Sequence, residues 1–138
     1  MKIHGSCSCG FITFEADADP EKVAICHCTD CQTSTGTAFR INVPVPGNAF
    51  KMLSGTPSIY IKTTAESGNL RAQAFCPQCA SPTYSTQPGD GPKLSYMLRI
   101  GTLRERDQLA PKVQNWTRSA RPWVTEIGAL PRNEKGAT

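Results

Sequence analysis

The sequence predicts a single, mostly β domain with little helix. Short segments of alternating apolar and polar residues recur along the chain, and eleven Gly and eleven Pro residues divide them with turns. The length of 138 residues suits one domain with a modest core. We expect this domain to span residues 1–127 and residues 128–138 to form a loose C-terminal tail.

Five segments have the composition and the period-two alternation of β-strands, and Gly- and Pro-rich turns separate them. They lie at residues 10–16, 38–45, 58–64, 70–75 and 93–100, and residues 111–117 are a candidate last strand. Pro44 and Pro46 should either place the second segment at a sheet edge or end it, because proline cannot donate a ladder hydrogen bond.

The charge and the hydropathy of the chain exclude some function classes. Seven thiolates and two Zn²⁺ ions would bring the formal charge of +4 down to +1, which argues against a basic nucleic-acid surface. No run of roughly 18 apolar residues predicts a membrane span. The N-terminus has no signal-peptide hydrophobic region, so we expect a cytoplasmic protein whose thiols stay reduced. The sequence makes no prediction of the oligomeric state.

Four of the seven cysteines form two pairs with the spacing of metal ligands. In C-x-C, Cys7 and Cys9 lie on one face of an extended segment, and in C-x-x-C, Cys76 and Cys79 have the spacing of a zinc knuckle. Together they predict a structural, tetrahedral zinc site. A redox pair, buried inert cysteines and an iron–sulfur cluster are the alternatives.

The other three cysteines, Cys26, Cys28 and Cys31, form C-x-C-x-x-C, and all three could hold one Zn²⁺. No cysteine is left to be a fourth ligand, and three protein ligands with an open position are typical of catalytic zinc. His27 lies between two of the ligands and His4 lies upstream of the first pair. Either could fill the fourth position, which would make both sites structural.

A zinc ion with three thiolates is a weak Lewis acid that suits a soft ligand such as a further thiol. A metal-bound thiol next to a small carbonyl suggests that a C–S bond is formed or broken. Ser34, Thr35 and Gly36 could hold the carbonyl oxygen, although an ordinary turn is the simpler explanation of these residues.

The segments GSCSCG, CHCTDCQ, TGTAFR and FCPQCAS together resemble the glutathione-dependent formaldehyde-activating enzyme (GFA) family, which also contains centromere protein V-like proteins. The resemblance runs from about residue 5 to residue 123 and includes all seven cysteines. It implies a β-tent of layered antiparallel sheets that zinc holds together, with two zinc ions per chain. It also implies that the first four cysteines hold structural zinc, that the other three hold catalytic zinc, and that glutathione and formaldehyde form S-hydroxymethylglutathione in a carbon–sulfur lyase reaction.

Two positions depart from the family pattern. Gln32 stands where the family often has Arg, and Ala80 stands where it usually has Gly. Gln32 leaves the substrate open, because a cation there could bind a carboxylate. Arg40, Lys51 and Arg71 are other candidates for a glutathione carboxylate, and each could also be an ordinary surface residue.

The leading hypothesis is therefore a zinc enzyme that acts on a small thiol such as glutathione. The alternative is a non-catalytic, zinc-stabilised binding module with an exposed patch. Trp116 and Trp123 could belong to such a patch, although we expect at least one of them to pack in the core. A third hypothesis is a redox or metal-buffering role for the three-cysteine segment.

Overall fold

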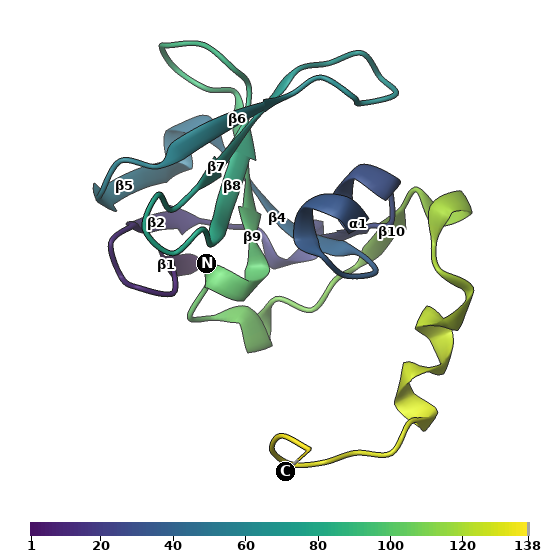
Figure 1. Ribbon diagram of the computed structural model, residues 1–138. Coiled ribbons are helices and arrows are strands. Elements are labelled where there is room, and N and C mark those ends of the chain that lie inside the picture. Colours follow the sequence, from purple (N-terminus) through teal and green to yellow (C-terminus); the bar gives the residue numbers. More distant parts are fainter. Residues whose placement is uncertain (138) are drawn as a thin grey trace.

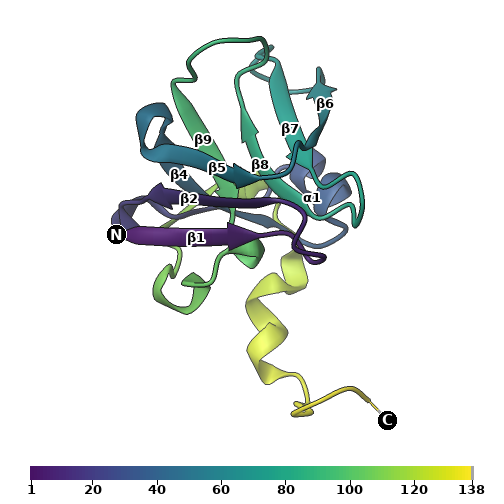
Figure 2. The ribbon, with the colours of Figure 1, turned by 90° about the vertical axis from the view of Figure 1, so that its left-hand side faces the viewer.

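The computed structural model describes residues 1–137, in which ten strands form two sheets (Figure 1). The smaller sheet is antiparallel and has the order β1-β2-β5. Its strands are β1 (Lys2–Ser6), β2 (Thr13–Asp17) and β5 (Phe50–Ser54). Figure 2 views the molecule from the side of this sheet.

The larger sheet has the order β10-β3-β4-β9-β8-β7-β6, and only its first pair, β10 with β3, is parallel. Its strands are β3 (Ala24–Cys26), β4 (Arg40–Pro46), β6 (Ser58–Lys62), β7 (Arg71–Phe75), β8 (Pro82–Thr86), β9 (Ser95–Arg99) and β10 (Val113–Asn115). Within residues 1–137 there is one α-helix, α1 (Thr29–Thr35), and six short 3-10 helices. The 3-10 helices are η1 (Pro20–Lys22), η2 (Gly47–Ala49), η3 (Ile100–Thr102), η4 (Arg106–Gln108), η5 (Thr117–Ser119) and η6 (Pro122–Ala129). The prediction of a mostly β fold with layered sheets and little helix is confirmed.

The hydrophobic core lies between the smaller sheet and one face of the larger sheet. Side chains alternate between the two faces of a strand, so every second residue of the larger sheet points into this core. The buried residues that the two sheets contribute include Ile3, Phe14, Ala16, Val43, Val45, Ala74, Tyr84 and Leu98. The opposite face of the larger sheet is therefore free for other side chains.

All five expected strand segments, and the candidate last strand, contain strands of the structure. The sequence analysis missed four strands: β1, β3, β5 and β8. β3 has only three residues, and β8 begins with a proline, so neither shows a clear alternation of apolar and polar residues. The sequence analysis also did not foresee α1, which has only seven residues.

Pro44 and Pro46 were expected either to lie at a sheet edge or to end the strand, and β4 does end at Pro46. β4 is an interior strand, but its partner β3 pairs only with residues 40–42 of it. Both prolines pair with β9 alone, so the half of β4 that contains them is locally an edge. Proline is tolerated there because that half has a neighbour on one side only.

Gly5 lies opposite Phe14 in the register of β1 and β2. A Cβ atom on Gly5 would lie 2.1 Å from the Phe14 ring, so the ring covers a position that only glycine leaves free. This contact fixes how β2 packs on β1, next to the first cysteine pair.

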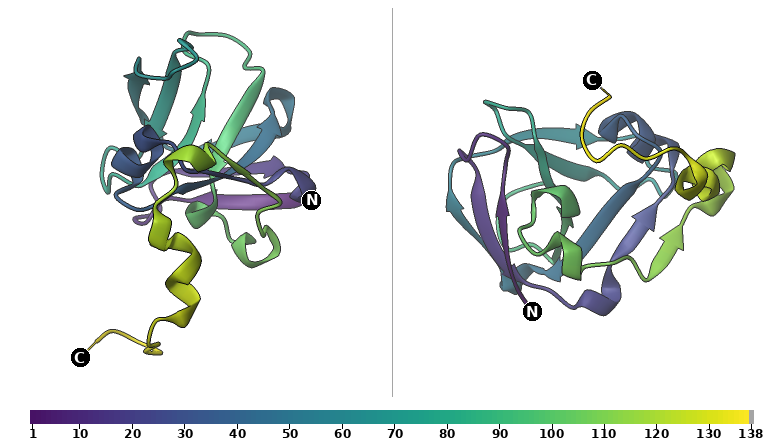
Figure 3. Two further views of the ribbon diagram at one scale, coloured as in Figure 1. Left: turned by 90° about the vertical axis from the view of Figure 1, so that its right-hand side faces the viewer. Right: turned by 90° about the horizontal axis from the view of Figure 1, so that it is seen from below.

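The C-terminal segment leaves the body of the molecule after η5, and η6 lies apart from both sheets in every view (Figures 1 and 3). Trp123, Ile127 and Leu130 are exposed there. The boundary of the domain at residue 127 stays a prediction. Among residues 1–137, no helix combines the length and the apolar character that a membrane span requires.

Candidate metal centres and the cavity beside them

The first cysteine group joins the two sheets. Cys7 and Cys9 follow β1 in the smaller sheet, and Cys76 and Cys79 follow β7 in the larger sheet. All four sulfur atoms lie within 4.8 Å of one another, with 3.6 Å between Cys7 Sγ and Cys9 Sγ and 3.7 Å between Cys9 Sγ and Cys76 Sγ. Four sulfurs at about 2.3 Å from a tetrahedral Zn²⁺ would be about 3.8 Å apart. The observed spacing therefore fits zinc.

Backbone N–H groups already point at these sulfurs. Ile12 N donates to Cys7 Sγ at 3.2 Å, and Gln78 N and Cys79 N donate to Cys76 Sγ at 3.4 and 3.5 Å. Such bonds hold a thiolate in place and stabilise its charge. Cys76 is fully buried, so this group lies at the edge of the core.

The second group lies where β3 meets α1. Cys26 ends β3, Cys28 is the N-cap residue of α1, and Cys31 is buried in the first turn of the helix. Their three sulfur atoms also lie within 4.8 Å of one another. Cys28 Sγ accepts a hydrogen bond from Cys31 N at 3.3 Å, which explains why the helix begins here.

Without a cation, the thiols of Cys26 and Cys31 have pKa values that are shifted in opposite directions. The hydrogen bond from Cys31 lowers the pKa of Cys26 to about 5 against the opposing effect of burial. The same contact, together with burial, raises the pKa of Cys31. A cation between Cys26 and Cys31 would favour the ionised form of both thiols, as it does in a metal site.

Neither histidine belongs to a cysteine group within residues 1–137. His27 is buried, its Nε2 lies 2.8 Å from Gln114 Oε1, and its ring meets the ring of Phe39 edge-on. His4 Nδ1 lies 2.6 Å from Glu105 Oε1. The described residues therefore bring three cysteine ligands together at the second group and place no fourth ligand with them.

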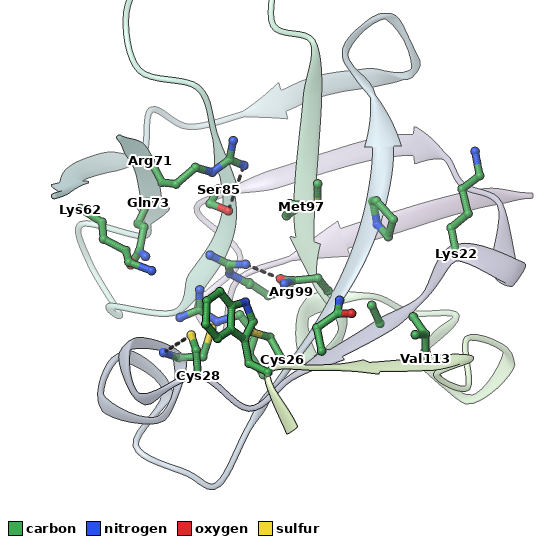
Figure 4. Close-up of a pocket in the computed structure, with 17 residues that line it drawn as sticks. Lys22, Cys26, Cys28, Lys62, Arg71, Gln73, Ser85, Met97, Arg99 and Val113 are labelled. Carbon is green, nitrogen blue, oxygen red and sulfur yellow. Dashed lines mark hydrogen bonds between the residues drawn. The ribbon is translucent and has the colours of Figure 1, made fainter. Parts of the chain in front are cut away.

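The second group lines a cavity of about 710 Å³ on the face of the larger sheet that points away from the core. All seven strands of that sheet contribute to the lining through alternate residues, which is the period-two pattern that makes the other face apolar. Figure 4 shows Cys26 and Cys28 at one end of this cavity, with Arg71, Ser85 and Arg99 beside it.

The cavity is rich in cations, and its lining contains no Asp or Glu. Arg40, Arg71 and Arg99 come from β4, β7 and β9, and Lys62 comes from β6. The structure thus places two of the three sequence candidates, Arg40 and Arg71, next to the cysteines. It places Lys51 on β5 in the smaller sheet, away from the cavity.

The sequence analysis missed Arg99, Lys62, Asn42, Gln73 and Ser85, which also line the cavity. Four of them lie in segments that the sequence predicted, whereas Ser85 lies in β8, which the sequence analysis missed. Which strand neighbours which depends on the order of strands in the sheet. Asn42 lies opposite Arg99 and Gln73 opposite Ser85 only because β4 pairs with β9 and β7 with β8. No local signal carries that information.

Both tryptophans are exposed, with 41% of Trp116 and 53% of Trp123 accessible, so the expectation that at least one packs in the core was wrong. Trp116 instead lines the cavity and has a backbone φ of 58°. This left-handed conformation is strained for a bulky residue, and such strain tends to occur at functional sites.

Comparison with protein families gives one match over most of the chain. The family described as glutathione-dependent formaldehyde-activating enzyme matches residues 2–119. The chain belongs to the GFA family. Membership suggests a function in glutathione-related formaldehyde activation and a small thiol as the partner.

A comparison with curated proteins found no match. Among solved structures, a crystal structure of a Rhodobacter sphaeroides protein is similar, with a TM-score of 0.60 and 17% sequence identity. The match covers 83% of this chain and 100% of the other. At this identity the likeness shows the fold alone.

The two departures from the GFA pattern now have structural explanations. Gln32 Nε2 donates to the carbonyl oxygens of His27 and Ser119, at 2.7 and 2.9 Å, so it ties α1 to the C-terminal segment. Ala80 has a φ of 62°, a left-handed conformation that glycine adopts without strain. Neither residue is a sulfur ligand.

The segment after the cysteines in this GFA chain is the end of a helix. Thr35 Oγ1 donates to Cys31 O at 2.7 Å, and Ser34 Oγ accepts a hydrogen bond from Arg40. Gly36 has a φ of 70° and closes α1 as its C-cap. Thr35 therefore uses its hydroxyl proton within the helix, whereas Ser34 accepts from Arg40 and keeps its own proton to donate.

Proposed function

We propose that this chain is a zinc-dependent carbon–sulfur lyase-type enzyme. It joins a small thiol, such as glutathione, to a small carbonyl compound, such as formaldehyde, and also runs the reverse reaction. One observation carries the proposal: three cysteine sulfurs meet at one end of a cationic cavity, and no fourth protein ligand of the described residues joins them.

The two cysteine groups have different roles in this proposal. Cys7, Cys9, Cys76 and Cys79 hold a structural Zn²⁺ with a complete protein ligand set. Cys26, Cys28 and Cys31 hold the catalytic ion, so the chain carries two zinc ions. Bound there, zinc lowers the pKa of an added thiol so that the thiol binds as a thiolate near neutral pH.

The reaction forms one bond between the thiol sulfur and the carbonyl carbon. The π pair of the carbonyl moves to its oxygen, and that oxygen gains the proton that the thiol lost, so no oxidant or reductant is needed. Arg40 and Arg99 create a positive potential that favours the thiolate in the cavity. Trp116, at the wall of the cavity, reduces the access of water to the reacting atoms.

Exchange NMR tests this proposal, because formaldehyde and thiols also combine slowly without a catalyst. Zinc-loaded protein should increase the rate at which free glutathione and its hydroxymethyl adduct interconvert. Cys28→Ser should lose this increase, whereas Lys51→Ala, outside the cavity, should keep it. Equal rates with and without the wild-type protein would refute the proposal.

Zinc K-edge absorption gives an independent measurement. A site with four sulfurs and a site with three give a mean of about 3.5 sulfur ligands per zinc, and an added thiol should raise the mean to about 4. If saturating thiol leaves the mean unchanged, the thiol does not bind at the metal.

A further inference from the structure

Three arginines on the cavity face of the larger sheet have no acidic partner. Arg40 and Arg99 are each only 7% exposed, and Arg71 is half-buried. The ion pairs among residues 1–137 all involve other cations. A buried charge without a counter-charge is costly, so this arrangement needs an explanation beyond folding.

The hydrogen bonds of these arginines leave donors unused. Arg99 donates to Asn42 Oδ1, and Arg71 Nη2 reaches Ser85 Oγ only at 3.5 Å. The Nε atoms of Arg40 and Arg99 are buried and have no protein partner. All three arginines line the cavity, and a guanidinium group can bind a planar oxyanion through two parallel hydrogen bonds.

The arginines are close enough to affect one another and the cysteines. Burial, and then the positive charge of Arg40, lower the pKa of Arg99 to about 9, while Cys31 and Cys26 act in the opposite direction. Arg40 lies opposite Cys26 in the register of β4 and β3, and Arg99 lines the same cavity. An anion bound by these arginines would therefore lie next to the thiol that binds the proposed zinc.

We propose that Arg40, Arg71 and Arg99 form a carboxylate-binding subsite, so that the small-molecule substrate carries a carboxylate close to its reacting sulfur. The identity of the bound molecule as the reacting substrate rests on the proposed function; the anion subsite itself does not. In this subsite the arginine side chains bind the carboxylate, and the three cysteines that would hold zinc take no part in that binding.

A count of charges favours one carboxylate. Lys62 pairs with Asp30 and Lys22 is exposed to solvent, so the remaining groups, three arginines and a zinc with three thiolates, sum to a formal charge of +2. A thiolate and one carboxylate neutralise this charge, whereas a phosphate dianion in place of the carboxylate leaves an excess of negative charge. The subsite should therefore prefer carboxylate to phosphate.

The cavity offers little to an ammonium group. Two carboxylates, Asp30 and Glu66, line a smaller cavity that shares Cys28, Lys62 and Trp116 with this one, and they already pair with Lys62 and Arg118. The expected order of affinity among small thiols is therefore 3-mercaptopropionate, then 2-mercaptoethanol, then cysteamine, which are anionic, neutral and cationic. Glutathione carries one ammonium group, so its affinity should not exceed that of 3-mercaptopropionate.

The test observes the arginines directly. In zinc-loaded protein, the Nε–Hε signals of Arg40 and Arg99 are followed by ¹H–¹⁵N NMR while propionate, which has no thiol, is added. We expect saturable shifts of these signals and a dissociation constant for propionate. Inorganic phosphate, added in a separate titration, should bind more weakly.

Arg71 is the residue to substitute first, because it is only half-buried and makes one weak hydrogen bond. Arg71→Met should weaken propionate binding about tenfold to a hundredfold, the usual effect of losing a charged hydrogen bond. Arg71→Lys should recover only part of the affinity, because lysine lacks the planar pair of donors. Arg132→Met is the matched control on the exposed C-terminal segment and should bind like the wild type.

The outcomes separate the two proposals. If propionate fails to bind, if phosphate binds more tightly, or if Arg71→Met binds propionate like the wild type, the carboxylate subsite is refuted. If the three thiols bind equally well, it is also refuted, and the proposed function stands. If propionate binds as expected but no thiol adds sulfur to the zinc, the subsite stands and the proposed function fails.

Discussion

Serine substitutions in the two cysteine groups should have very different effects on stability. Cys76→Ser removes a ligand from the group that joins the two sheets. Cys28→Ser removes a ligand from a group that lies within one short stretch of chain. We expect the first substitution to unfold the domain at moderate temperature, and the second to leave a folded protein without activity.

The expected difference follows from how much chain each group closes. Cys9 and Cys76 are 67 residues apart, whereas Cys26 and Cys31 are five apart. From the entropy of loop closure alone, the connection between Cys9 and Cys76 should stabilise the folded state by about 2 kcal/mol more than the connection between Cys26 and Cys31. Structural zinc typically binds with about 10–16 kcal/mol, which is comparable to the whole stability of a small domain.

Burial adds to the effect at Cys76. This residue is fully buried in the core cluster, and its sulfur accepts two backbone N–H groups. A serine hydroxyl is a poor zinc ligand. Its C–O bond is also shorter than the C–S bond of cysteine, so the oxygen would not lie where the two backbone N–H groups now find the sulfur. Cys28 is only half-buried, so its substitution affects the start of α1 but not the core.

Urea unfolding with excess zinc, together with the zinc content of each purified variant, measures the difference. Cys76→Ser should lower the free energy of unfolding by several kcal/mol and lose most of the structural zinc. Cys28→Ser should change it by less than about 2 kcal/mol, because serine is itself a favoured N-cap residue and Cys28 lies outside the core. Equal destabilisation by the two variants would contradict the assignment of one structural and one catalytic group.

Three further predictions concern single residues outside the metal ligands. Gly5→Ala should destabilise the domain strongly, because its Cβ would overlap the Phe14 ring; a wild-type melting temperature would refute this packing. Ala80→Gly should raise stability by up to about 1 kcal/mol in urea unfolding, since it relieves a left-handed alanine, whereas a loss would show that chain entropy outweighs the strain. Burial alone would raise the pKa of Glu105, but hydrogen bonds from His4 lower it, so its contribution to stability is present above about pH 4.5 and is lost as the pH falls through the lowered pKa. Glu105→Gln should therefore lose less stability than the wild type on acidification, and parallel acid-unfolding curves would count against the ion pair.

The sequence predicted what depends on local spacing. It placed Cys7 with Cys9 and Cys76 with Cys79 because these distances along the chain match metal ligands, and the structure brings the two pairs together. The five expected strand segments also contain strands, because alternation is a local pattern. The arrangement of sheets as two packed layers follows from burying one face of each.

The sequence could not predict what depends on which strands are neighbours. Arg40 was a candidate, but Arg99 was not, because its place in the cavity depends on the pairing of β9 with β4. Trp116 was a candidate for packing in the core, but it is exposed and adopts a left-handed backbone conformation that no local pattern indicated. The residues that line the cavity therefore depend on how the strands pair, whereas the cysteine ligands could be recognised from their spacing along the chain.

The unpaired arginines and the cysteine group that joins the sheets are energetically connected in our proposals. Burying several cations without counter-charges costs several kcal/mol, and a domain of this size has little stability to spare. The zinc proposed for Cys7, Cys9, Cys76 and Cys79 offsets that cost, because it stabilises the folded state without using the cavity face of the larger sheet. Side chains alternate between the two faces of each strand, so packing of the core and anion binding use different faces of the larger sheet. Residues on one face pack against the smaller sheet, and residues on the other face remain free to bind an anion. It follows that a bound carboxylate should raise the stability of the zinc-loaded protein, since it pairs charges that folding alone leaves unpaired.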